Sequence, residues 1–221
     1  MPLIFNKIFD HDNTQIAVWE NNEHDDFYIN ALNVCDKDLE EIMSYREHRR
    51  KEWLCSRYII NLICESTTPL TILKDEYGKP FIKDSNLNIS ISHSNNRAAV
   101  IISDKLVGID IQKQEEKIDR IFHKFISEEE QSKIETQHTK SSYHIFWGAK
   151  EAMYKGWGKK ELDFKTHMHV YPFSCYQNNL ELKGWVRKEN IIQEYDLFTD
   201  ILEDYYLVFA VLNKASQPDK N

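Results

Sequence analysis

The stretch FWGAKEAMYKGWGK, residues 146–159, combines features that neither a surface helix nor a core helix usually has. Residues four apart share one face of an α-helix, so Trp147, Glu151 and Lys155 form a single stripe. As a surface ion pair, Glu151 and Lys155 would stabilise the helix by only about 0.3–0.5 kcal/mol. The tryptophan instead indicates partial burial, where a carboxylate needs a partner or a metal ion. Gly156 and Gly158 predict the point at which the helix ends.

The stretch VGIDIQ, residues 107–112, predicts a β-strand with two unlike faces. Alternate residues of a strand share a face, so the three apolar residues point to the core and Gly108, Asp110 and Gln112 point the other way. A glycine inside a strand often marks the close approach of a ligand or of backbone. The oxygens of Asp110 and Gln112 could then help to hold a hard cation such as Mg²⁺. The alternative is an ordinary solvent-facing polar side.

Composition narrows the class of protein. The chain has 221 residues and a formal net charge of −8, which disfavours general nucleic-acid binding because phosphate backbones select basic faces. No apolar run approaches the ~20 residues that span a bilayer, and we expect neither a signal peptide nor a membrane partner. The four cysteines lack metal-ligand spacing. We interpret them as reduced, which predicts a cytoplasmic protein.

The N-terminal part of the sequence predicts helix and then strands. Residues 37–66 have the apolar spacing of one amphipathic helix, and Gly-Lys-Pro at 78–80 marks a turn. Residues 98–103 and 106–112 are β-rich and flank the polar pair Asp104-Lys105. This pattern predicts a β-hairpin.

The C-terminal part repeats the order of helix and then strands. Residues 114–158 read as helical with a polar interruption at 135–142, and Ser127 with Glu130 resembles a capping box. Four β-rich runs follow, at residues 166–173, 180–187, 195–200 and 205–213. The chain is therefore predicted to be α+β, with two halves that join near residues 104–113.

A third group of candidate residues is cationic. Arg46, Arg50 and Arg57 fall near one face of the predicted early helix, whereas Arg49 lies about 60° outside that stripe. Guanidinium groups suit phosphate oxygens. A solvated charged face is the alternative interpretation.

Further polar residues lie outside that helix. Lys79 sits in the predicted turn, and Ser92 with His93 lies at a strand end. His167 and His169 could share a strand face and bind zinc, but nothing else of metal-ligand spacing accompanies them.

Together these segments resemble the 4′-phosphopantetheinyl transferases, in particular the two-halved, single-chain Sfp-like type. VGIDIQ is similar to the family's G-[IV]-D-x-[EQ] signature, and FWGAKEAMYKGWGK is similar to its W-x-x-K-E-[AS]-x-x-K signature. YGKPFI, NISISHS, RRKEWLCSRYII and FHKFISEEE resemble four further family segments. The order and spacing of these motifs make the resemblance specific.

The resemblance implies a fold, an activity and a cofactor. The fold would be two similar α/β halves, at 1–105 and 106–213, with the active site in the cleft between them and a solvated tail at 214–221. The activity would be transfer of the 4′-phosphopantetheine arm of coenzyme A to a serine hydroxyl of an apo acyl or peptidyl carrier protein, releasing 3′,5′-ADP. The cofactor would be Mg²⁺, and the enzyme would act as a monomer.

The resemblance also implies residue roles. The metal carboxylates would be Asp110 and Glu151, with Glu151 also the general base, and Gln112 would be a third metal ligand. Lys155 would contact the diphosphate. The residues implied to bind the rest of coenzyme A are Arg57, Lys79, Pro80, Ser92 and His93, and with less certain helix register Arg46 and Arg50.

Two departures from the family pattern bear on these roles. Many Sfp-like members carry Glu where this chain has Gln112, which predicts a working enzyme with a looser metal site that Gln112→Glu would tighten. SHSNN lacks the glycine that often follows Ser-His-Ser, which changes the expected local loop shape.

The carrier protein would dock on a local apolar or basic patch, which we expect within residues 113–146. That patch would include Phe122, Lys124, Phe125 and Ile126. Three other functions stay open. They are a non-catalytic relative that binds coenzyme A or a carrier protein, a Mg²⁺-dependent nucleotide phosphohydrolase, and a purely structural module.

Overall fold

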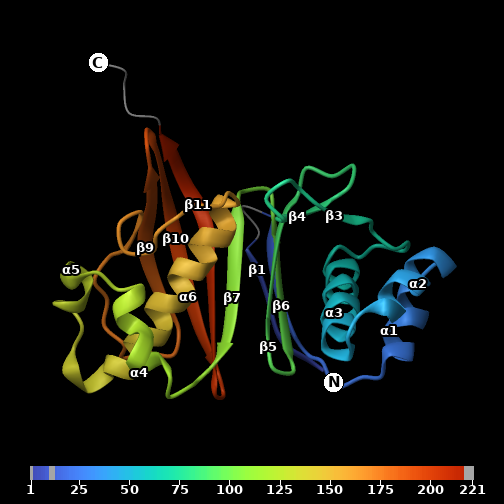
Figure 1. Ribbon diagram of the computed structural model, residues 1–221, viewed down its shortest axis with the longest axis horizontal. Helices are drawn as coiled ribbons and strands as arrows, with labels where there is room; N and C mark the ends of the chain where they lie inside the picture. Colours follow the sequence, from blue (N-terminus) through green and yellow to red (C-terminus); the bar gives the residue numbers. More distant parts are fainter. Residues whose placement is uncertain (1, 10–12, 217–221) are drawn as a thin grey trace. The chain divides into compact units, whose positions relative to one another are not determined.

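The computed structural model describes residues 2–9 and 13–216 (Figure 1). It divides into two compact units, Met1–Asp104 and Lys105–Asn221. Each unit has one antiparallel sheet packed with helices. The predicted α+β class is therefore confirmed.

The N-terminal unit is a six-stranded sheet covered by three helices (Figure 1). The strand order is β1-β2-β6-β5-β4-β3. Its strands are β1 (Leu3–Phe9), β2 (Thr14–Glu20), β3 (Ile72–Lys74), β4 (Pro80–Ile82), β5 (Asn88–Ser94) and β6 (Arg97–Ser103). Its helices are α1 (Asp25–Leu32), α2 (Asp36–Ser44) and α3 (Glu47–Ile63). The buried face of α3, with Leu54 and Ile59, packs into the same core as Val100 of β6.

The predicted single helix over 37–66 is wrong, because the chain leaves the helical conformation at Tyr45 and Arg46. Both residues have extended backbone, with ψ of 152° and 148°. The Arg50 guanidinium donates a hydrogen bond to the Tyr45 carbonyl (3.2 Å) and so satisfies one acceptor that the break releases. Apolar spacing does not reveal such a break, since both helices bury residues on one side.

The predicted hairpin across Asp104-Lys105 is also wrong. Strand β6 pairs with β2 and β5, whereas β7 (Val107–Lys113) pairs with β11 (Tyr205–Ser216) in the other sheet. Every residue of β6 is buried, as expected for a strand with neighbours on both edges. The hairpin that does form joins β5 to β6 through Asn95, which adopts the left-handed conformation (φ 52°) that asparagine tolerates better than most residues.

The C-terminal unit is a five-stranded sheet in the order β7-β11-β10-β9-β8, crossed by the long helix α6 (Figure 1). Its other strands are β8 (Met168–Val170), β9 (Leu180–Lys188) and β10 (Ile191–Leu202). Its helices are α4 (Ile118–Ile121), α5 (Glu128–Gln131) and α6 (Thr139–Trp157), with 3₁₀ turns η2 (Phe122–Lys124) and η3 (Thr136–His138). The four predicted β-rich runs are confirmed, and so is the capping box of Ser127 and Glu130. Strand β11 extends to Ser216, so residues 214–216 of the predicted tail are strand, and 217–221 lie outside the described residues.

Helix α6 approaches the sheet closely at Gly108 of β7. A Cβ atom on Gly108 would lie 1.9 Å from the Ala152 carbonyl oxygen and 2.6 Å from the Gly156 nitrogen. The strand glycine thus marks close approach of backbone, as the sequence predicted. The face of β7 that carries Asp110 and Gln112 therefore lies against α6 and is not the solvent-facing side of an ordinary strand.

Among the residues that the structure describes, no helix is both long enough and apolar enough to cross a membrane.

The Gly108 contact leads to a test by substitution. Gly108→Ala should lower the free energy of unfolding by about 3 kcal/mol or more, because the new methyl group meets fixed backbone and not a movable side chain. Gly156→Ala is the matched control, since the three atoms nearest to its Cβ would all belong to the Tyr195 side chain, at 3.0–3.4 Å. Urea unfolding of both variants measures the difference. Equal stability of the two variants would contradict the close contact.

Candidate active site

The centre of the candidate site joins β7 to α6 through Asp110 and Lys155. The Lys155 Nζ donates to Asp110 Oδ1 (2.9 Å) and to the Ile109 carbonyl oxygen (2.8 Å). The Asp110 side chain is only 10% exposed, and that of Lys155 is 26% exposed. The predicted meeting of a strand carboxylate with the helix stripe therefore occurs within the C-terminal unit.

Glu151 lies in the same neighbourhood and carries a strongly shifted pKa. Burial and, to a smaller extent, the negative charge of Asp110 together raise the pKa of Glu151 to about 7, although the Lys155 ammonium partly offsets them. The Asp110 and Glu151 carboxylates repel each other, and one ammonium only partly offsets this repulsion. A divalent cation bound to their oxygens would relieve it.

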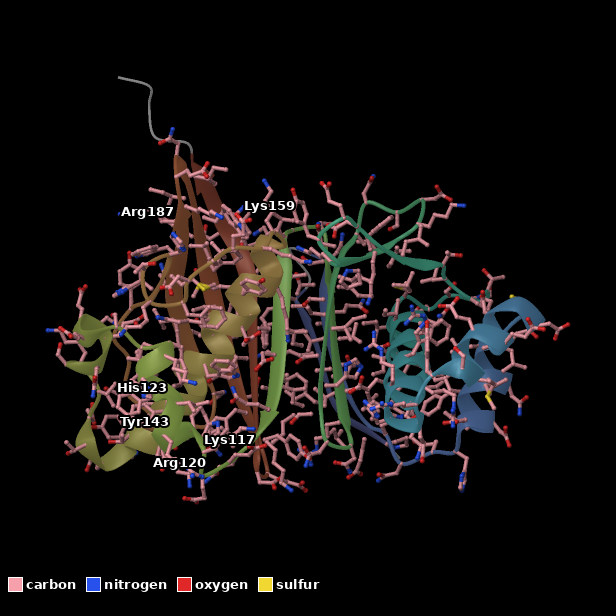
Figure 2. All side chains as sticks on the ribbon, viewed as in Figure 1. Lys117, Arg120, His123, Tyr143, Lys159 and Arg187 are labelled. Atoms are coloured by element: carbon pink, nitrogen blue, oxygen red, sulfur yellow. The ribbon has the colours of Figure 1, made fainter. Side chains whose placement is uncertain are left out.

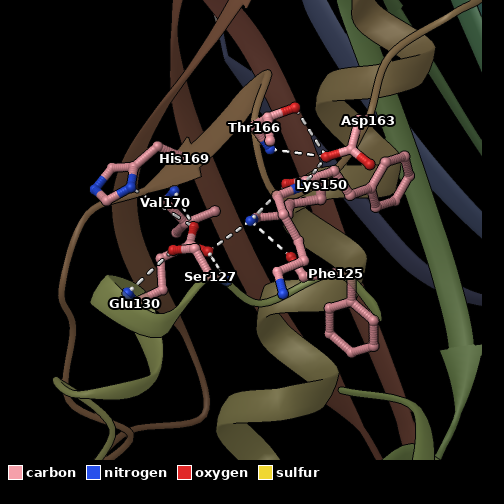
Figure 3. Close-up of polar contacts among 10 residues, drawn as sticks. Phe125, Ser127, Glu130, Lys150, Asp163, Thr166, His169 and Val170 are labelled. Atoms are coloured by element: carbon pink, nitrogen blue, oxygen red, sulfur yellow. Dashed lines mark hydrogen bonds and ion pairs between the residues drawn. The ribbon is translucent and has the colours of Figure 1, made fainter. Parts of the chain in front are cut away.

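A buried ion pair fixes the helix turn that carries Glu151 (Figure 3). The preceding residue, Lys150, has a side chain that is 0% exposed and contacts Glu130 Oε2 at 2.7 Å. Its other two hydrogen bonds go to the carbonyl oxygens of Phe125 and Phe164, both at 2.8 Å. All three ammonium donors are thus satisfied, as a buried lysine requires.

Both carboxylate oxygens of Glu130 likewise accept hydrogen bonds. Its Oε1 accepts from the Val170 N–H (2.9 Å), and its Oε2 accepts from the Ser127 N–H (2.8 Å). Together with Lys150, this carboxylate ties α5, the segment after α6 and strand β8 to one turn of α6. The sequence reasoning used Glu130 only as a cap and did not single out Lys150, because its environment is set by residues 14 to 25 positions away.

Gln112, the third predicted metal ligand, has its amide turned to His144 of α6. Its Nε2 donates to the His144 carbonyl oxygen (3.0 Å), and its Oε1 lies 3.1 Å from His144 Nδ1. Its role toward a metal stays a prediction.

The residues present fit a hard cation in part. Asp110 and Glu151 offer oxygen ligands, yet no group of three or more His, Cys, Asp or Glu side chains capable of holding a metal occurs in the described part of the chain. Mg²⁺ accepts such a site, because it usually keeps several waters and takes further oxygens from a substrate phosphate. The two histidines considered for zinc have other contacts. His167 Nδ1 accepts from the Asp163 N–H (2.8 Å), and His169 stacks on Trp185.

The N-terminal unit contains a cavity of about 790 Å³ beside α3. Arg57, Pro80 and His93 of the predicted set line it, as does Gly78 next to Lys79. Its lining also includes the acidic side chains of Asp38, Glu41 and Glu52. A cavity of this size holds a small-molecule ligand with both polar and apolar parts.

The cations beside this cavity have pKa values that burial lowers and that a bound anion would raise. Burial lowers the pKa of Arg57 to about 10 and the pKa of Lys79 to about 8. The Arg57 guanidinium lies 3.6 Å from the centre of the Trp53 ring, which fixes its position by cation–π contact. Burial disfavours the charged forms of these side chains, and a bound phosphate would favour them again through its negative charge.

The cavity does not gather every predicted cation. Arg50 forms a 2.5 Å ion pair with Asp25, and neither it nor Arg46 lines the cavity, whereas Arg49 does. The predicted helical stripe is wrong for Arg46, which is the N-cap of α3, whereas Arg50 and Arg57 both lie within α3. Ser92 is buried and also does not line the cavity, because it lies on the strand face opposite to Ile91 and His93.

The expected carrier-docking patch needs a further correction. Phe125 and Ile126 are 1% and 2% exposed, so they belong to the core and cannot meet a partner. Figure 2 shows Lys117, Arg120 and His123 together at the α4 end of the C-terminal unit. All three are exposed, as is Lys124.

Comparison with known proteins finds a match to one family. The model of the 4′-phosphopantetheinyl transferase superfamily matches residues 106–203, the segment that contains Asp110, Glu151 and Lys155. The predicted resemblance is confirmed.

Two curated relatives are similar to the chain. It is 35% identical over 112 residues to "4′-phosphopantetheinyl transferase gsp" of Aneurinibacillus migulanus, covering 49% of this chain and 46% of the relative. It is 35% identical over 89 residues to "4′-phosphopantetheinyl transferase" of Bacillus subtilis, covering 38% and 39%. The matched region spans less than half the length of either relative.

The raised pKa of Glu151 predicts a pH-dependent stability. Folding favours the neutral form of the Glu151 carboxyl. Its contribution to the free energy of unfolding is therefore fully present below the unfolded pKa near ~4.3 and is lost as the pH rises through the folded pKa of about 7. In EDTA at pH 8, Glu151→Gln should therefore be more stable than the wild type by about 1–3 kcal/mol, and the gap should vanish near pH 4.

Urea unfolding at several pH values measures this gap. Glu129→Gln, at an exposed position on α5, is the matched control and should show no such gap. A Glu151→Gln gap that stays constant from pH 4 to pH 8 would contradict the raised pKa.

Proposed function

We propose that this protein transfers the 4′-phosphopantetheine moiety of coenzyme A to a serine hydroxyl of an apo acyl or peptidyl carrier protein, with Mg²⁺ as cofactor. The observation that carries the proposal is the grouping of Asp110, Glu151 and Lys155 within a segment of the matching superfamily. The names of both relatives support the same activity.

The reaction forms one P–O bond and breaks another. The serine oxygen attacks the β-phosphorus of the coenzyme A diphosphate, and the bond from that phosphorus to the bridging oxygen breaks. The bridging oxygen leaves with 3′,5′-ADP, and the serine proton passes to Glu151. Without metal the pKa of Glu151 is raised to about 7, and a bound Mg²⁺ would lower it, so the carboxylate would be the form that accepts the proton at neutral pH.

Asp110 and Glu151 would hold the Mg²⁺, which supplies positive charge to the diphosphate as its negative charge grows. Lys155 is held by Asp110 and the Ile109 carbonyl oxygen, so its ammonium is oriented before substrate arrives. Such preorganised charge stabilises a transition state without further rearrangement.

We place the nucleotide end of coenzyme A in the cavity of the N-terminal unit. The 3′-phosphate would meet Arg57 and His93, with Arg49 in place of the predicted Arg46 and Arg50, and Lys79 at the margin. Support for this placement comes from the chemistry of the ligand, whose nucleotide carries a 3′-phosphate and a 5′-diphosphate.

Mass spectrometry of a carrier protein tests the function directly. The protein, coenzyme A, Mg²⁺ and a panel of apo carrier proteins are expected to yield phosphopantetheinylated carrier. Asp110→Asn, Glu151→Gln and Lys155→Met should each lower kcat by about 100-fold or more, because each removes charge stabilisation at the diphosphate. Arg187→Gln, at an exposed position on β9, which does not pair with β7, should not.

Other outcomes separate the alternatives. Binding of coenzyme A with no mass added to any carrier would favour a non-catalytic relative. Release of phosphate from a nucleotide in the absence of carrier would favour a phosphohydrolase. If the protein neither binds coenzyme A nor turns over a substrate, the results would favour a purely structural module.

We further propose that the carrier protein docks on the exposed basic side chains near α4. Carrier proteins are generally acidic, and the −8 net charge of this chain does not attract them overall. Arg120, His123 and Lys124 supply local positive charge within the expected 113–146 region.

Charge reversal tests this docking surface. Arg120→Glu with Lys124→Glu should raise the KM for carrier protein by about tenfold at low salt and leave the KM for coenzyme A unchanged. Arg187→Glu, which reverses a charge at the other end of the unit (Figure 2), is the matched control. A carrier footprint that misses residues 113–146 would overturn the placement.

A further inference from the structure

We propose that Gln112 is a structural link between β7 and α6 and not a metal ligand, so that Asp110 and Glu151 are the protein ligands of the cation. The part of this inference that concerns the metal rests on the proposed function. The part that concerns the link does not. It replaces the expectation that Gln112 completes the metal site.

Both polar ends of the Gln112 side chain are used by one residue of α6. The amide nitrogen donates to the His144 carbonyl oxygen at 3.0 Å, and the amide oxygen lies 3.1 Å from His144 Nδ1. The two bonds form a cyclic contact in which the amide plane is fixed. A metal ligand would need the same oxygen to point toward a cation instead.

The hydrogen-bond partners of His144 determine which ring nitrogen carries the proton. The Glu115 backbone N–H donates to His144 Nε2 (3.3 Å), so Nε2 is the acceptor. A neutral imidazole then carries its hydrogen on Nδ1 and donates it to the Gln112 oxygen. Burial lowers the pKa of His144, which agrees with a neutral ring. Gln112, His144 and Glu115 thus form one chain of satisfied donors and acceptors.

The ring cannot readily leave this position. His144 is 1% exposed and stacks on Tyr206 of β11, with ring centres 4.7 Å apart and planes 8° apart. One turn along α6, Gly148 lets the helix approach, because a Cβ there would lie 3.0 Å from Gln112 Nε2 and 2.6 Å from Val208 Cγ2. Gln112 is therefore held between helix and sheet.

Distance along the helix separates this link from the carboxylates. His144 precedes Glu151 by seven residues, which is about 10 Å at 1.5 Å per residue. The Gln112 amide is bound at the His144 end, whereas Asp110 is bound to Lys155 beyond Glu151. A cation with Mg–O distances of ~2.1 Å at Asp110 and Glu151 would have to pull the amide off His144 to reach it.

The same contacts explain why an amide suits this position better than a carboxylate. Glutamate could accept from His144 Nδ1, but its second oxygen would face the His144 carbonyl oxygen, and two acceptors in contact repel. Glutamine supplies one donor and one acceptor in the required order. Gln112→Glu is therefore expected to lower the Tm and not to tighten Mg²⁺ binding.

Metal titration tests whether Gln112 is a metal ligand or a structural link between β7 and α6. Mn²⁺, an oxygen-binding stand-in for Mg²⁺, is titrated by electron paramagnetic resonance with and without coenzyme A, and Mg²⁺ by calorimetry. Gln112→Met keeps the side-chain length and should leave the metal Kd within threefold of the wild type. Asp110→Asn and Glu151→Gln should raise it at least tenfold. A tenfold loss in Gln112→Met would overturn the proposal.

A second measurement tests the link without any metal. Nitrogen-15 NMR of labelled histidine should show the Nδ1–H tautomer for His144, and Gln112→Met should shift that signal. His144→Phe keeps a stacked ring but removes its side-chain bond, so the double variant should have the Tm of the less stable single variant. Additive Tm losses, or an unshifted His144 signal, would overturn the link.

The two measurements also separate this inference from the proposed function. A wild type that binds neither Mn²⁺ nor Mg²⁺ would count against the proposed metal site and against the two-ligand assignment together. The tautomer and the double-variant Tm would still decide whether Gln112 links β7 to α6.

Discussion

The candidate site depends on how closely helix α6 lies on strand β7. At Gly108 the helix backbone occupies the space where any other residue would place its Cβ, 1.9 Å from the Ala152 oxygen. This contact fixes the separation of helix and strand, and the two-residue period of the strand then brings Asp110 to Lys155 and Gln112 to His144. An aspartate and a lysine on separate elements can hold a 2.9 Å contact only when the elements themselves are held this near.

Two adjacent charged residues of α6, Lys150 and Glu151, lie in different environments. Lys150 is fully buried and its charge is cancelled by Glu130, while burial and the nearby Asp110 raise the pKa of Glu151 to about 7. A buried ion pair with every bond satisfied contributes little net stability over apolar residues, but loss of one partner costs about 3–5 kcal/mol. The Lys150–Glu130 pair therefore specifies which segments surround the helix. It also leaves the Glu151 carboxylate beside it without a comparable partner.

Local periodicity predicted the site elements well and the long-range pairing poorly. The alternation in residues 107–112 and the i, i+4 stripe of Trp147, Glu151 and Lys155 depend only on strand and helix geometry, and both hold. The hairpin across Asp104-Lys105 failed because strand partners are chosen by burial over the whole sheet, and β6 already has two. The arginine register failed because an extended Tyr45-Arg46 break leaves no trace in apolar spacing. His144, which decides the orientation of Gln112, is 32 residues away and follows no motif.

The cations beside the N-terminal cavity follow from the same balance of burial and charge. Removing a guanidinium or ammonium from water costs free energy, and the lowered pKa values of Arg57 (about 10) and Lys79 (about 8) record that cost. Arg50, by contrast, forms an ion pair with Asp25, whose negative charge offsets that of the guanidinium. A phosphate bound near Arg57 would recover the free energy that burial removes. An acidic chain can therefore bind an anion without being basic overall, because the binding energy comes from a few cations that folding has left in an unfavourable environment.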